Sequence, residues 1–227
     1  MSAPSSSFAK GSVFLFDLDG TLADTLPDIA ASTNYVRQRN GLAEVDVATV
    51  RSWIGDGARK LLQRALAEAD ASPEPADLDA AYECYCEHHD AHCTERSTLF
   101  PGVREFLDQL MEDGHPIAIV TNKPERFARP VARFLGLDRY TKVLVGGDTL
   151  PTRKPDPAML QHALTLLGCS PELPPGNVHM VGDGLQDVRA GKAFGAHTTA
   201  CLFGYGSPAA LRQEGADEYW GAFAIRV

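Results

Sequence analysis

Five short, largely apolar runs that each end in a turn constrain the fold of this chain most strongly. They lie at residues 13–16, 116–120, 142–145, 178–181 and 198–203. Short apolar runs of this kind are typical of strands that are buried on both faces of a parallel sheet. Most of them are followed by a helical stretch. This alternation predicts an α/β fold with a doubly wound, Rossmann-like parallel sheet.

The helical stretches between these runs are each followed by a glycine. We expect helices at residues 103–113, 125–135, 157–167 and 187–194, followed by Gly114, Gly136, Gly168 and Gly195. A glycine directly after the last helical residue adopts the left-handed capping conformation without a steric penalty from Cβ. The glycines therefore indicate where these helices end.

The segment between the first apolar run and residue 99 has a different character. It contains no convincing strand, and its patterns favour helices at residues 27–39, 47–53, 58–69 and 77–93, with a break at residues 72–75. We interpret residues 25–98 as a helical cap domain inserted into an α/β core domain of residues 12–24 and 99–227. The serine-rich residues 1–11 are predicted to form a flexible tail.

Charge and composition exclude several classes of function. The chain has 227 residues, a hydrophobic fraction of 44% and a net charge of −9. Nucleic-acid binders need clustered Lys and Arg, so no nucleic-acid partner is expected. An acidic protein that handles an anionic substrate must recruit a cation or focus positive charge locally.

Neither a membrane segment nor a secretion signal is predicted. No apolar run reaches the ~18 residues that a membrane-spanning helix requires, and the N-terminus has no apolar signal region. The five cysteines are an odd number in a chain too large to need disulfides, which favours reduced thiols and a cytoplasmic location. A monomer and a homodimer both remain open.

Polar residues collect where the apolar runs end. Asp17 and Asp19 follow the first run, Thr121 the second and Asp183 the fourth, and Lys154 lies further on from the third. The carboxyl ends of parallel strands meet at one edge of a sheet, so these side chains are expected to converge there. Two carboxylates that leave a buried strand are costly unless a cation neutralises them. Each short motif alone would also fit an ordinary turn or helix start.

The motifs together resemble those of the haloacid-dehalogenase superfamily. The segment DLDGTLADT at residues 17–25 is similar to its first motif, and Thr121-Asn122, Lys154-Pro155 and Gly182-Asp183 follow in the expected order. The resemblance extends over about residues 12–206. Four ordered motifs, each after an expected strand, are far more specific than one. The resemblance implies a haloacid-dehalogenase-type core with a helical cap.

Within the superfamily the chain is most similar to the phosphoglycolate phosphatases. The segments that carry this resemblance are WIGDG at 53–57, TNKP at 121–124, VGGD at 145–148, KPDP at 154–157 and GKA at 191–193. They imply hydrolysis of a small phosphomonoester, with 2-phosphoglycolate as the expected substrate. Another small metabolite or sugar phosphate, or a sugar-phosphate mutase on the same scaffold, remains the alternative.

The resemblance assigns the chemical steps to two aspartates and Mg²⁺. Asp17 is the expected nucleophile and forms an aspartyl-phosphate intermediate. Asp19 is the expected general acid and base. The side chains of Asp17 and Asp183 and the backbone carbonyl of Asp19 are expected to bind Mg²⁺, which prefers oxygen ligands. Asp187 is expected to orient a metal-bound water or Lys154.

Further residues are expected to bind the substrate. Thr121 should offer its hydroxyl and its backbone N–H to the phosphoryl oxygens, and Lys154 a positive charge. Asn122 is also expected to bind the substrate. Lys123 is expected at the rim, where it would bind the carboxylate of the substrate; a solvated lysine is the alternative. The cap is expected to contribute Gly55 and Gly57, which lie in a turn before a helix.

Two other features need interpretation. At Gly184-Leu185-Gln186, relatives often carry a Ser and an Asn, and we expect this departure to tune hydrogen bonds around the metal. The region from Cys84 to Cys93 also contains Cys86, His88, His89 and His92. Their spacing fits no zinc-finger pattern, so we expect a packed or solvated cap helix rather than a metal site.

Overall fold

The computed structural model describes residues 8–67, 74–170 and 172–224. Most of the predicted N-terminal tail, and residues 72–73 of the predicted break, lie outside these ranges. The secondary-structure elements of the core are β1 (Val13–Phe16), β2 (Ala23–Asp24), β3 (Thr98–Leu99), α5 (Val103–Glu112), β4 (Ile117–Val120), α6 (Glu125–Phe134), η1 (Leu137–Arg139), β5 (Leu144–Val145), α7 (Ala158–Leu166), η2 (Pro175–Asn177), β6 (Val178–Gly182), α8 (Leu185–Phe194), β7 (His197–Cys201), α9 (Pro208–Glu214) and β8 (Glu218–Trp220). The elements of the insert are α1 (Leu26–Arg39), α2 (Val47–Trp53), α3 (Ala58–Leu66) and α4 (Pro75–His92).

The main sheet is parallel and follows the strand order β5-β4-β1-β6-β7-β8. The chain first builds outward from β1 through β4 to β5, and then from β6 to β8 on the other side. Strand order therefore reverses at β1, whose residue Phe16 pairs with Ile119 on one side and Val181 on the other. The predicted doubly wound sheet is confirmed. The edge strand β8 was not predicted.

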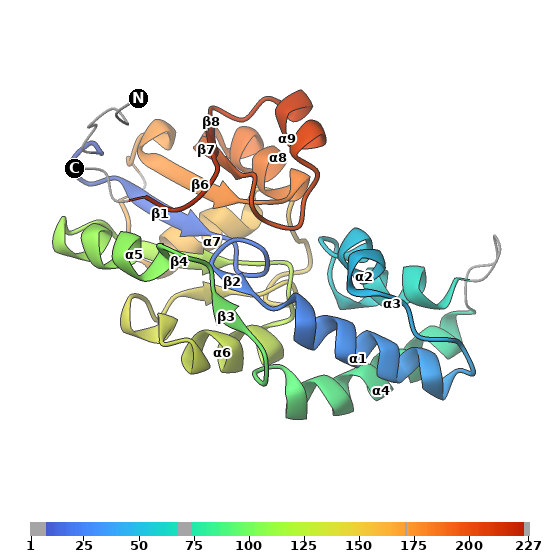
Figure 1. Cartoon of the computed structure of the whole chain (residues 1–227). Helices are drawn as coiled ribbons and strands as arrows, with labels where there is room; N and C mark the ends of the chain where they lie inside the picture. The colour runs from blue at the N-terminus through green and yellow to red at the C-terminus, as the bar shows by residue number, and fades with distance from the viewer. Residues whose placement is uncertain (1–7, 68–73, 171, 225–227) are drawn as a thin grey trace.

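Helices cover both faces of the sheet (Figure 1). The alternation of side chains along β1 explains how: Phe14 and Phe16 pack with α5 and α6, whereas Val13 and Leu15 pack with α7 and α8. All four side chains are buried. Because both faces are covered, the strands must be apolar throughout, which is why the short runs were visible in the sequence.

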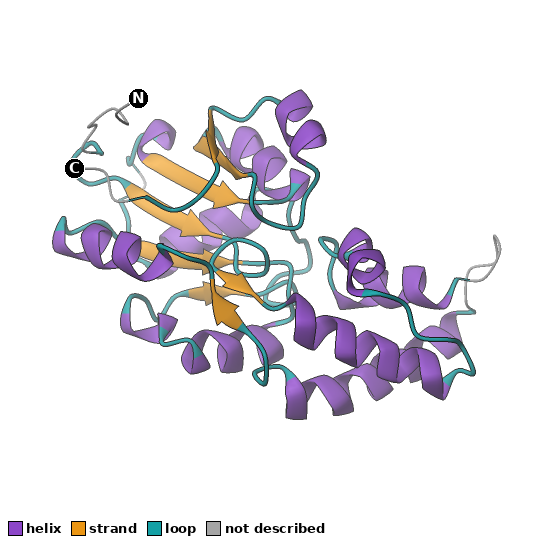
Figure 2. Ribbon diagram, in the orientation of Figure 1, coloured by secondary structure: helices purple, strands orange, loops and turns teal. Residues whose placement is uncertain are grey.

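The helical cap insert stands beyond the carboxyl ends of the strands, opposite the tips of the arrows in Figure 2. Its helices enclose a separate apolar core that includes Ile29, Val36 and Leu62. The two connections to the core pair with each other as the antiparallel ribbon β2–β3. Close to this ribbon, the buried carboxylate of Asp28 accepts hydrogen bonds from the backbone N–H groups of Arg96 and Ser97. The beginning of the insert is thereby fastened to its end.

Two expectations about the environment of the chain can be compared with the structure. Across the described ranges, no helix has both the length and the apolar character that crossing a membrane would require. The five cysteines form no disulfide with one another within the described residues.

Candidate active site

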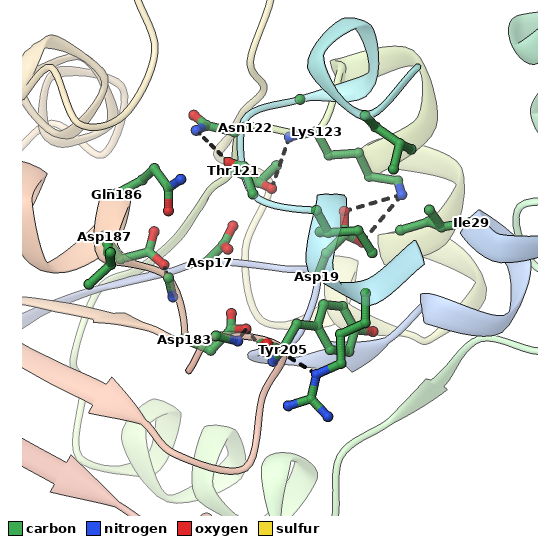
Figure 3. Close-up of a pocket in the computed structure, with 18 of the residues that line it drawn as sticks. Asp17, Asp19, Ile29, Thr121, Asn122, Lys123, Asp183, Gln186, Asp187 and Tyr205 are labelled. Atoms are coloured by element: carbon green, nitrogen blue, oxygen red, sulfur yellow. Dashed lines mark hydrogen bonds and ion pairs between the residues drawn. The ribbon is translucent and has the colours of Figure 1, made fainter. Parts of the chain in front are cut away.

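A cavity of ≈ 580 Å³ lies between the ends of the strands and the cap. Its wall combines polar side chains from the core with apolar ones from the cap, such as Ile29, Ile54 and Leu61. Figure 3 shows the aspartates gathered on the core side. Every residue predicted for the site lines this cavity: Asp17, Asp19, Gly55, Gly57, Thr121, Asn122, Lys123, Lys154, Asp183 and Asp187.

Three carboxylates form the centre of the site. Oxygen atoms of Asp17, Asp183 and Asp187 lie within 4.8 Å of one another. Asp17 directly follows β1, and Asp183 directly follows the neighbouring strand β6. Asp187 lies in the first turn of α8 and is brought back toward Asp17 by the turn between β6 and α8. Adjacent parallel strands thus account for the convergence.

Lys154 supplies one positive charge to this centre. Its Nζ lies 3.1 Å from Oδ1 of Asp17 and donates to Oδ1 of Asp187 at 2.6 Å and to the carbonyl of Val120 at 2.6 Å. Burial alone would lower the pKa of Lys154, but the charges of Asp17 and Asp187 outweigh it, so the pKa is raised. The ammonium therefore stays charged.

One lysine does not neutralise three carboxylates. Burial, together with the charges of Asp17 and Asp187, raises the pKa of Asp183. Among the described residues no donor is directed at Oδ1 of Asp17 in hydrogen-bond geometry, although that atom is buried. Buried oxygens with uncompensated charge are the ligands that a hard divalent cation prefers. The residues present therefore fit Mg²⁺.

Asp187 differs from the other two carboxylates because both of its oxygens are engaged. Oδ1 accepts from Lys154, and Oδ2 accepts from the backbone N–H of Gly184 at 2.9 Å. Such an arrangement favours an orienting role toward Lys154 over direct binding of a cation.

Asp19, two residues after Asp17, forms an ion pair with Lys123 (Figure 3). Lys123 Nζ is 3.2 and 3.3 Å from the two carboxylate oxygens, and the hydroxyl of Thr25 donates to Oδ1 at 2.6 Å. The side chain of Lys123 is only 4% exposed. The alternative of a solvated lysine is therefore wrong. Lys123 lines the cavity, but an internal carboxylate already pairs with it.

The sequence prediction for Thr121 needs a correction. Its backbone N–H donates to the carbonyl of Val145 at 2.9 Å, because Thr121 continues the pairing of β4 with β5. That N–H is not free to contact a phosphoryl group. The hydroxyl of Thr121 accepts from the backbone N–H of Lys123 at 3.2 Å and keeps its own hydrogen for another acceptor.

Asn122 connects the core to the cap. Its Nδ2 donates to the carbonyls of Lys154 and of Gly55, each at 3.0 Å. Gly57 lies close to the same residue, since a Cβ at Gly57 would come within 3.2 Å of the carbonyl of Asn122. The predicted turn of the cap therefore rests directly on the predicted phosphate-binding segment.

The segment of residues 184–186 contacts both the carboxylate centre and the cap. The backbone N–H of Gly184 donates to Asp187, and Gln186 donates from Nε2 to Oδ1 of Asp56 in the cap, at 2.6 Å. Gly55 makes room for it, because a Cβ there would lie 3.2 Å from Nε2 of Gln186. Gln186, at a position where relatives often carry another residue, therefore forms a contact between the core and the cap.

The histidines and cysteines of α4 contribute to packing within the cap. Nδ1 of His88 and Nδ1 of His89 both contact the hydroxyl of Ser32, at 3.1 and 2.8 Å. His92 pairs with Glu95 near the surface, and Cys86 and Cys93 are buried.

Comparison with known proteins identifies the family. A family model described as haloacid dehalogenase-like hydrolase matches residues 12–195. This chain belongs to the haloacid dehalogenase-like hydrolases. The resemblance found in the sequence is confirmed.

Several relatives of this hydrolase carry a more specific name. It is 37% identical over 197 residues to a phosphoglycolate phosphatase of Chromobacterium violaceum, which covers 86% of this chain and 87% of that protein. It is 39% identical over 204 residues to phosphoglycolate phosphatase 1 of Pseudomonas aeruginosa, with 88% and 72% covered. A solved structure described as a predicted phosphoglycolate phosphatase from Haemophilus somnus 129pt matches with a TM-score of 0.87 at 29% identity, covering 96% and 97%. The chain is thus an enzyme whose similarity is to phosphomonoester hydrolases.

Sequence reasoning missed several residues that shape the site of this hydrolase. Thr21 donates from its hydroxyl to Oδ1 of Asp183 at 2.9 Å, and it stood inside the first motif without a role. Arg51 of the cap and Tyr205 of the core both line the cavity. A tyrosine between glycines after the last central strand was the only local signal for Tyr205, and nothing in the sequence linked it to Asp183.

Proposed function

We propose that this enzyme hydrolyses a small phosphomonoester, 2-phosphoglycolate in the first place, with Mg²⁺ as cofactor and an aspartyl phosphate at Asp17. The enzyme class and the names of its relatives support the phosphatase activity. The cluster of three aspartates supports a cation site. The free thiols support a cytoplasmic location.

Asp17 is the proposed nucleophile. Its side chain lines the cavity, and its buried Oδ1 lies 3.1 Å from Nζ of Lys154. A carboxylate oxygen in this position attacks phosphorus while the bond from phosphorus to the ester oxygen breaks. Asp19 gives a proton to the departing oxygen and then takes one from the water that attacks the aspartyl phosphate. The products are the alcohol and inorganic phosphate.

The remaining groups hold and neutralise the phosphate. Mg²⁺, held by Asp17, Asp183 and the backbone carbonyl of Asp19, would lower the repulsion between the nucleophile and the phosphoryl oxygens. Lys154 stabilises the charge that develops on those oxygens, because Asp187 fixes its ammonium beside Asp17. The hydroxyl of Thr121 is available as a further donor.

The cavity also suits an ester with a charged tail. Beyond Lys154, the cationic side chains that line it are Lys123 and Arg51. Arg51 donates only to backbone carbonyls and, within the described part of the chain, pairs with no carboxylate. A substrate carboxylate would therefore find positive charge opposite the phosphoryl site. Gly55 and Gly57 form the neighbouring wall.

The observation that carries this proposal is that Asp17 lines the cavity with its Oδ1 3.1 Å from Nζ of Lys154 and its carboxylate clustered with that of Asp183. A panel of phosphate esters tests it, with 2-phosphoglycolate, sugar phosphates and p-nitrophenyl phosphate assayed with Mg²⁺ and with EDTA. We expect Mg²⁺-dependent release of phosphate, with the highest kcat/KM for 2-phosphoglycolate.

Asp17→Asn should lower kcat by several orders of magnitude, because an amide cannot replace the carboxylate nucleophile. Asp113→Asn, at the exposed end of α5, is the matched control and should behave as wild type. Normal turnover by Asp17→Asn, or by the chelated wild type, would disprove the mechanism. Conversion of a sugar phosphate to its isomer would identify the enzyme as a mutase.

A further inference from the structure

The loop of residues 204–206, which follows β7, holds the carboxylate of Asp183 in place. The backbone N–H of Tyr205 donates to Oδ2 of Asp183 at 2.6 Å, and that of Gly206 at 3.3 Å. A Cβ at Gly204 would overlap Asp183 and the carbonyl of Gly20, and one at Gly206 would overlap the carbonyl of Asp183. The backbone of the loop therefore packs directly against Asp183.

The side chain of Tyr205 extends from this loop to the start of the cap. Its hydroxyl oxygen accepts from the backbone N–H groups of Thr25 and Leu26, at 2.7 and 2.9 Å, and lies 2.9 Å from Oδ1 of Asp24. A phenolic hydroxyl has two acceptor positions and one hydrogen. The two N–H groups fill the acceptor positions, and the hydrogen is donated to Asp24. All hydrogen-bonding positions of this hydroxyl are thus occupied by residues 24–26, at the start of the cap.

This contact adds an acceptor at the start of helix α1, where the backbone N–H of Leu26 has a longer second contact, 3.3 Å, with Oδ1 of Asp24. The first N–H groups of a helix have no partner within the helix and need an acceptor from outside it. Thr25 precedes α1, and a threonine at this position usually accepts a hydrogen bond from the helix with its side-chain oxygen. Here the side chain of Thr25 makes no such contact, and its hydroxyl donates to Asp19 instead. Tyr205, 180 residues away in the sequence, serves as the acceptor from the core.

A second cap helix is attached to the same loop. Arg51, in α2, donates from Nε to the carbonyl of Tyr205 at 3.0 Å and from Nη2 to the carbonyl of Gly204. The residues 204–206 therefore contact α1, α2 and Asp183 at once. Figure 3 shows Tyr205 between Asp183 and the cap side of the cavity.

We propose that Tyr205 is a positioning residue that couples the placement of the cap to the carboxylate of Asp183. The proposal rests on the proposed function in one respect, namely that Asp183 binds the cation. Movement of the start of α1 must move the phenol, because its hydroxyl makes three contacts there. The backbone N–H of the same residue then moves relative to Asp183. Coupling of this kind is reciprocal, so a ligand that fixes Asp183 also favours the position of the cap in this structure.

Tyr205→Phe tests the coupling, because it removes one oxygen and keeps the ring and the N–H that faces Asp183. Tyr219→Phe is the matched control, since it removes a phenolic hydroxyl that contacts only the carbonyl of Arg212 at 3.4 Å. Two quantities are measured on each protein. The first is amide hydrogen exchange over residues 22–28, and the second is Mg²⁺ affinity by calorimetry.

We expect exchange at Thr25 and Leu26 to accelerate about two- to tenfold in Tyr205→Phe, the factor that one net hydrogen bond gives. The dissociation constant for Mg²⁺ should rise about fivefold or more, the lower end for coupled sites. Tyr219→Phe should change neither quantity. Arg51→Met, which detaches α2 but spares Tyr205, should also weaken Mg²⁺ binding and provides a second variant should Tyr205→Phe fold poorly.

Two results would overturn the proposal. Unchanged exchange at residues 22–28 would mean that Tyr205 does not hold α1. If exchange accelerates in Tyr205→Phe but the Mg²⁺ affinity is unchanged in both Tyr205→Phe and Arg51→Met, then Tyr205 only caps α1 and does not couple the cap to Asp183. A wild-type protein that binds no Mg²⁺ would instead refute the proposed function, and the two failures are thereby distinguishable.

Discussion

At the scale of single residues, Lys123 has two possible partners. In the structure its ammonium pairs with Asp19, the proposed general acid and base. The sequence had suggested a contact with the carboxylate of the substrate. Both contacts place a positive charge on the same side of the cavity, and an ion pair of buried groups is costly to break by removing one partner. The two roles therefore predict different consequences for different substrates.

Lys123→Met keeps most of the side chain and removes the charge. Because Asp19 loses its partner, we expect kcat/KM to fall about tenfold or more on every phosphate ester. Any additional loss that is confined to 2-phosphoglycolate measures the contact with the tail of the substrate. Lys142→Met, which removes a lysine that is 80% exposed, is the control. Equal activity of Lys123→Met and wild type would exclude both roles.

His89 is a residue whose protonation opposes folding. Its Nδ1 lies 2.8 Å from the hydroxyl of Ser32, and its Nε2 is buried without a hydrogen-bond partner among the residues described. Burial, with smaller effects of Lys123 and His88, lowers the pKa of His89 from 6.5 to about 2. The folded protein therefore holds this imidazole neutral.

The sign of the pH dependence follows. The pKa of His89 is lower in the folded protein than in the unfolded chain. Its contribution to the free energy of unfolding is therefore fully present above pH 6.5 and is lost as the pH falls from 6.5 toward 2. From pH 7 to pH 5 the loss should be about 2 kcal/mol. His89→Asn keeps a donor for Ser32 and should remove this slope, although its stability at pH 7 is lower. Urea unfolding at both pH values measures it, with His162→Asn on α7 as control. Parallel profiles of wild type and His89→Asn would contradict the assignment.

At the scale of secondary-structure elements, the start of α8 meets the turn between α2 and α3. Gln186 donates to Asp56, whose other carboxylate oxygen pairs with Arg64 within the cap. Burial by itself would raise the pKa of Asp56, but the hydrogen bonds from Arg64 and Gln186 outweigh this effect, so the pKa is lowered. The carboxylate of Asp56 is thereby a charged acceptor for Gln186, and the contact joins the cap to the core in the arrangement that the structure shows.

Gln186→Asn shortens the side chain by one methylene and should break this contact. Because a hydrogen bond to a charged group contributes about 1.5–3 kcal/mol net, we expect KM for 2-phosphoglycolate to rise about 10- to 150-fold. The value of kcat should change less. Gln109→Asn, which shortens an exposed glutamine bonded to Asp113, is the matched control. A change in kcat alone would place Gln186 in the chemistry rather than in closure.

Most of the central elements could be predicted from the sequence because burial on both faces makes them apolar. The strands β1, β4 and β6, and the aspartates at the ends of β1 and β6, followed from this pattern. The ribbon β2–β3 could not be predicted, since each strand has only two residues and is formed by pairing across the whole insert. The roles of Tyr205 and Gln186 were hidden for the same reason, because their partners lie more than a hundred residues away.

At the scale of the whole molecule, the carboxylate centre should link metal binding to stability. The pKa of Asp183 is raised by burial and by its neighbours, chiefly Asp17. A carboxyl group whose pKa is raised by folding destabilises the ionised protein as the pH rises above its ordinary value of 3.8. Mg²⁺ bound there, as in the proposed function, would offset this repulsion, and a ligand of the native state raises its stability.

We therefore expect Mg²⁺ to raise Tm more at pH 7.5 than at pH 5. Thermal unfolding with Mg²⁺ and with EDTA measures the difference at both pH values. Asp183→Ala should abolish the Mg²⁺-dependent rise, whereas Asp113→Asn should retain it. An equal rise at the two pH values would show that the carboxylates are not the source of the effect.

The ribbon β2–β3 has a consequence for how such an enzyme can change over generations. Ala23 lies opposite Leu99 and Asp24 opposite Thr98, so the insert leaves the core and returns to it at neighbouring points. A segment with adjacent ends can be replaced by another without altering the path of the rest of the chain. Recombination at this ribbon would exchange the helices, and with them the preference for one ester over another, while Asp17 and Asp183 stay where they are. New substrates would then be acquired by grafting a different insert rather than by rebuilding the centre that reacts with phosphate.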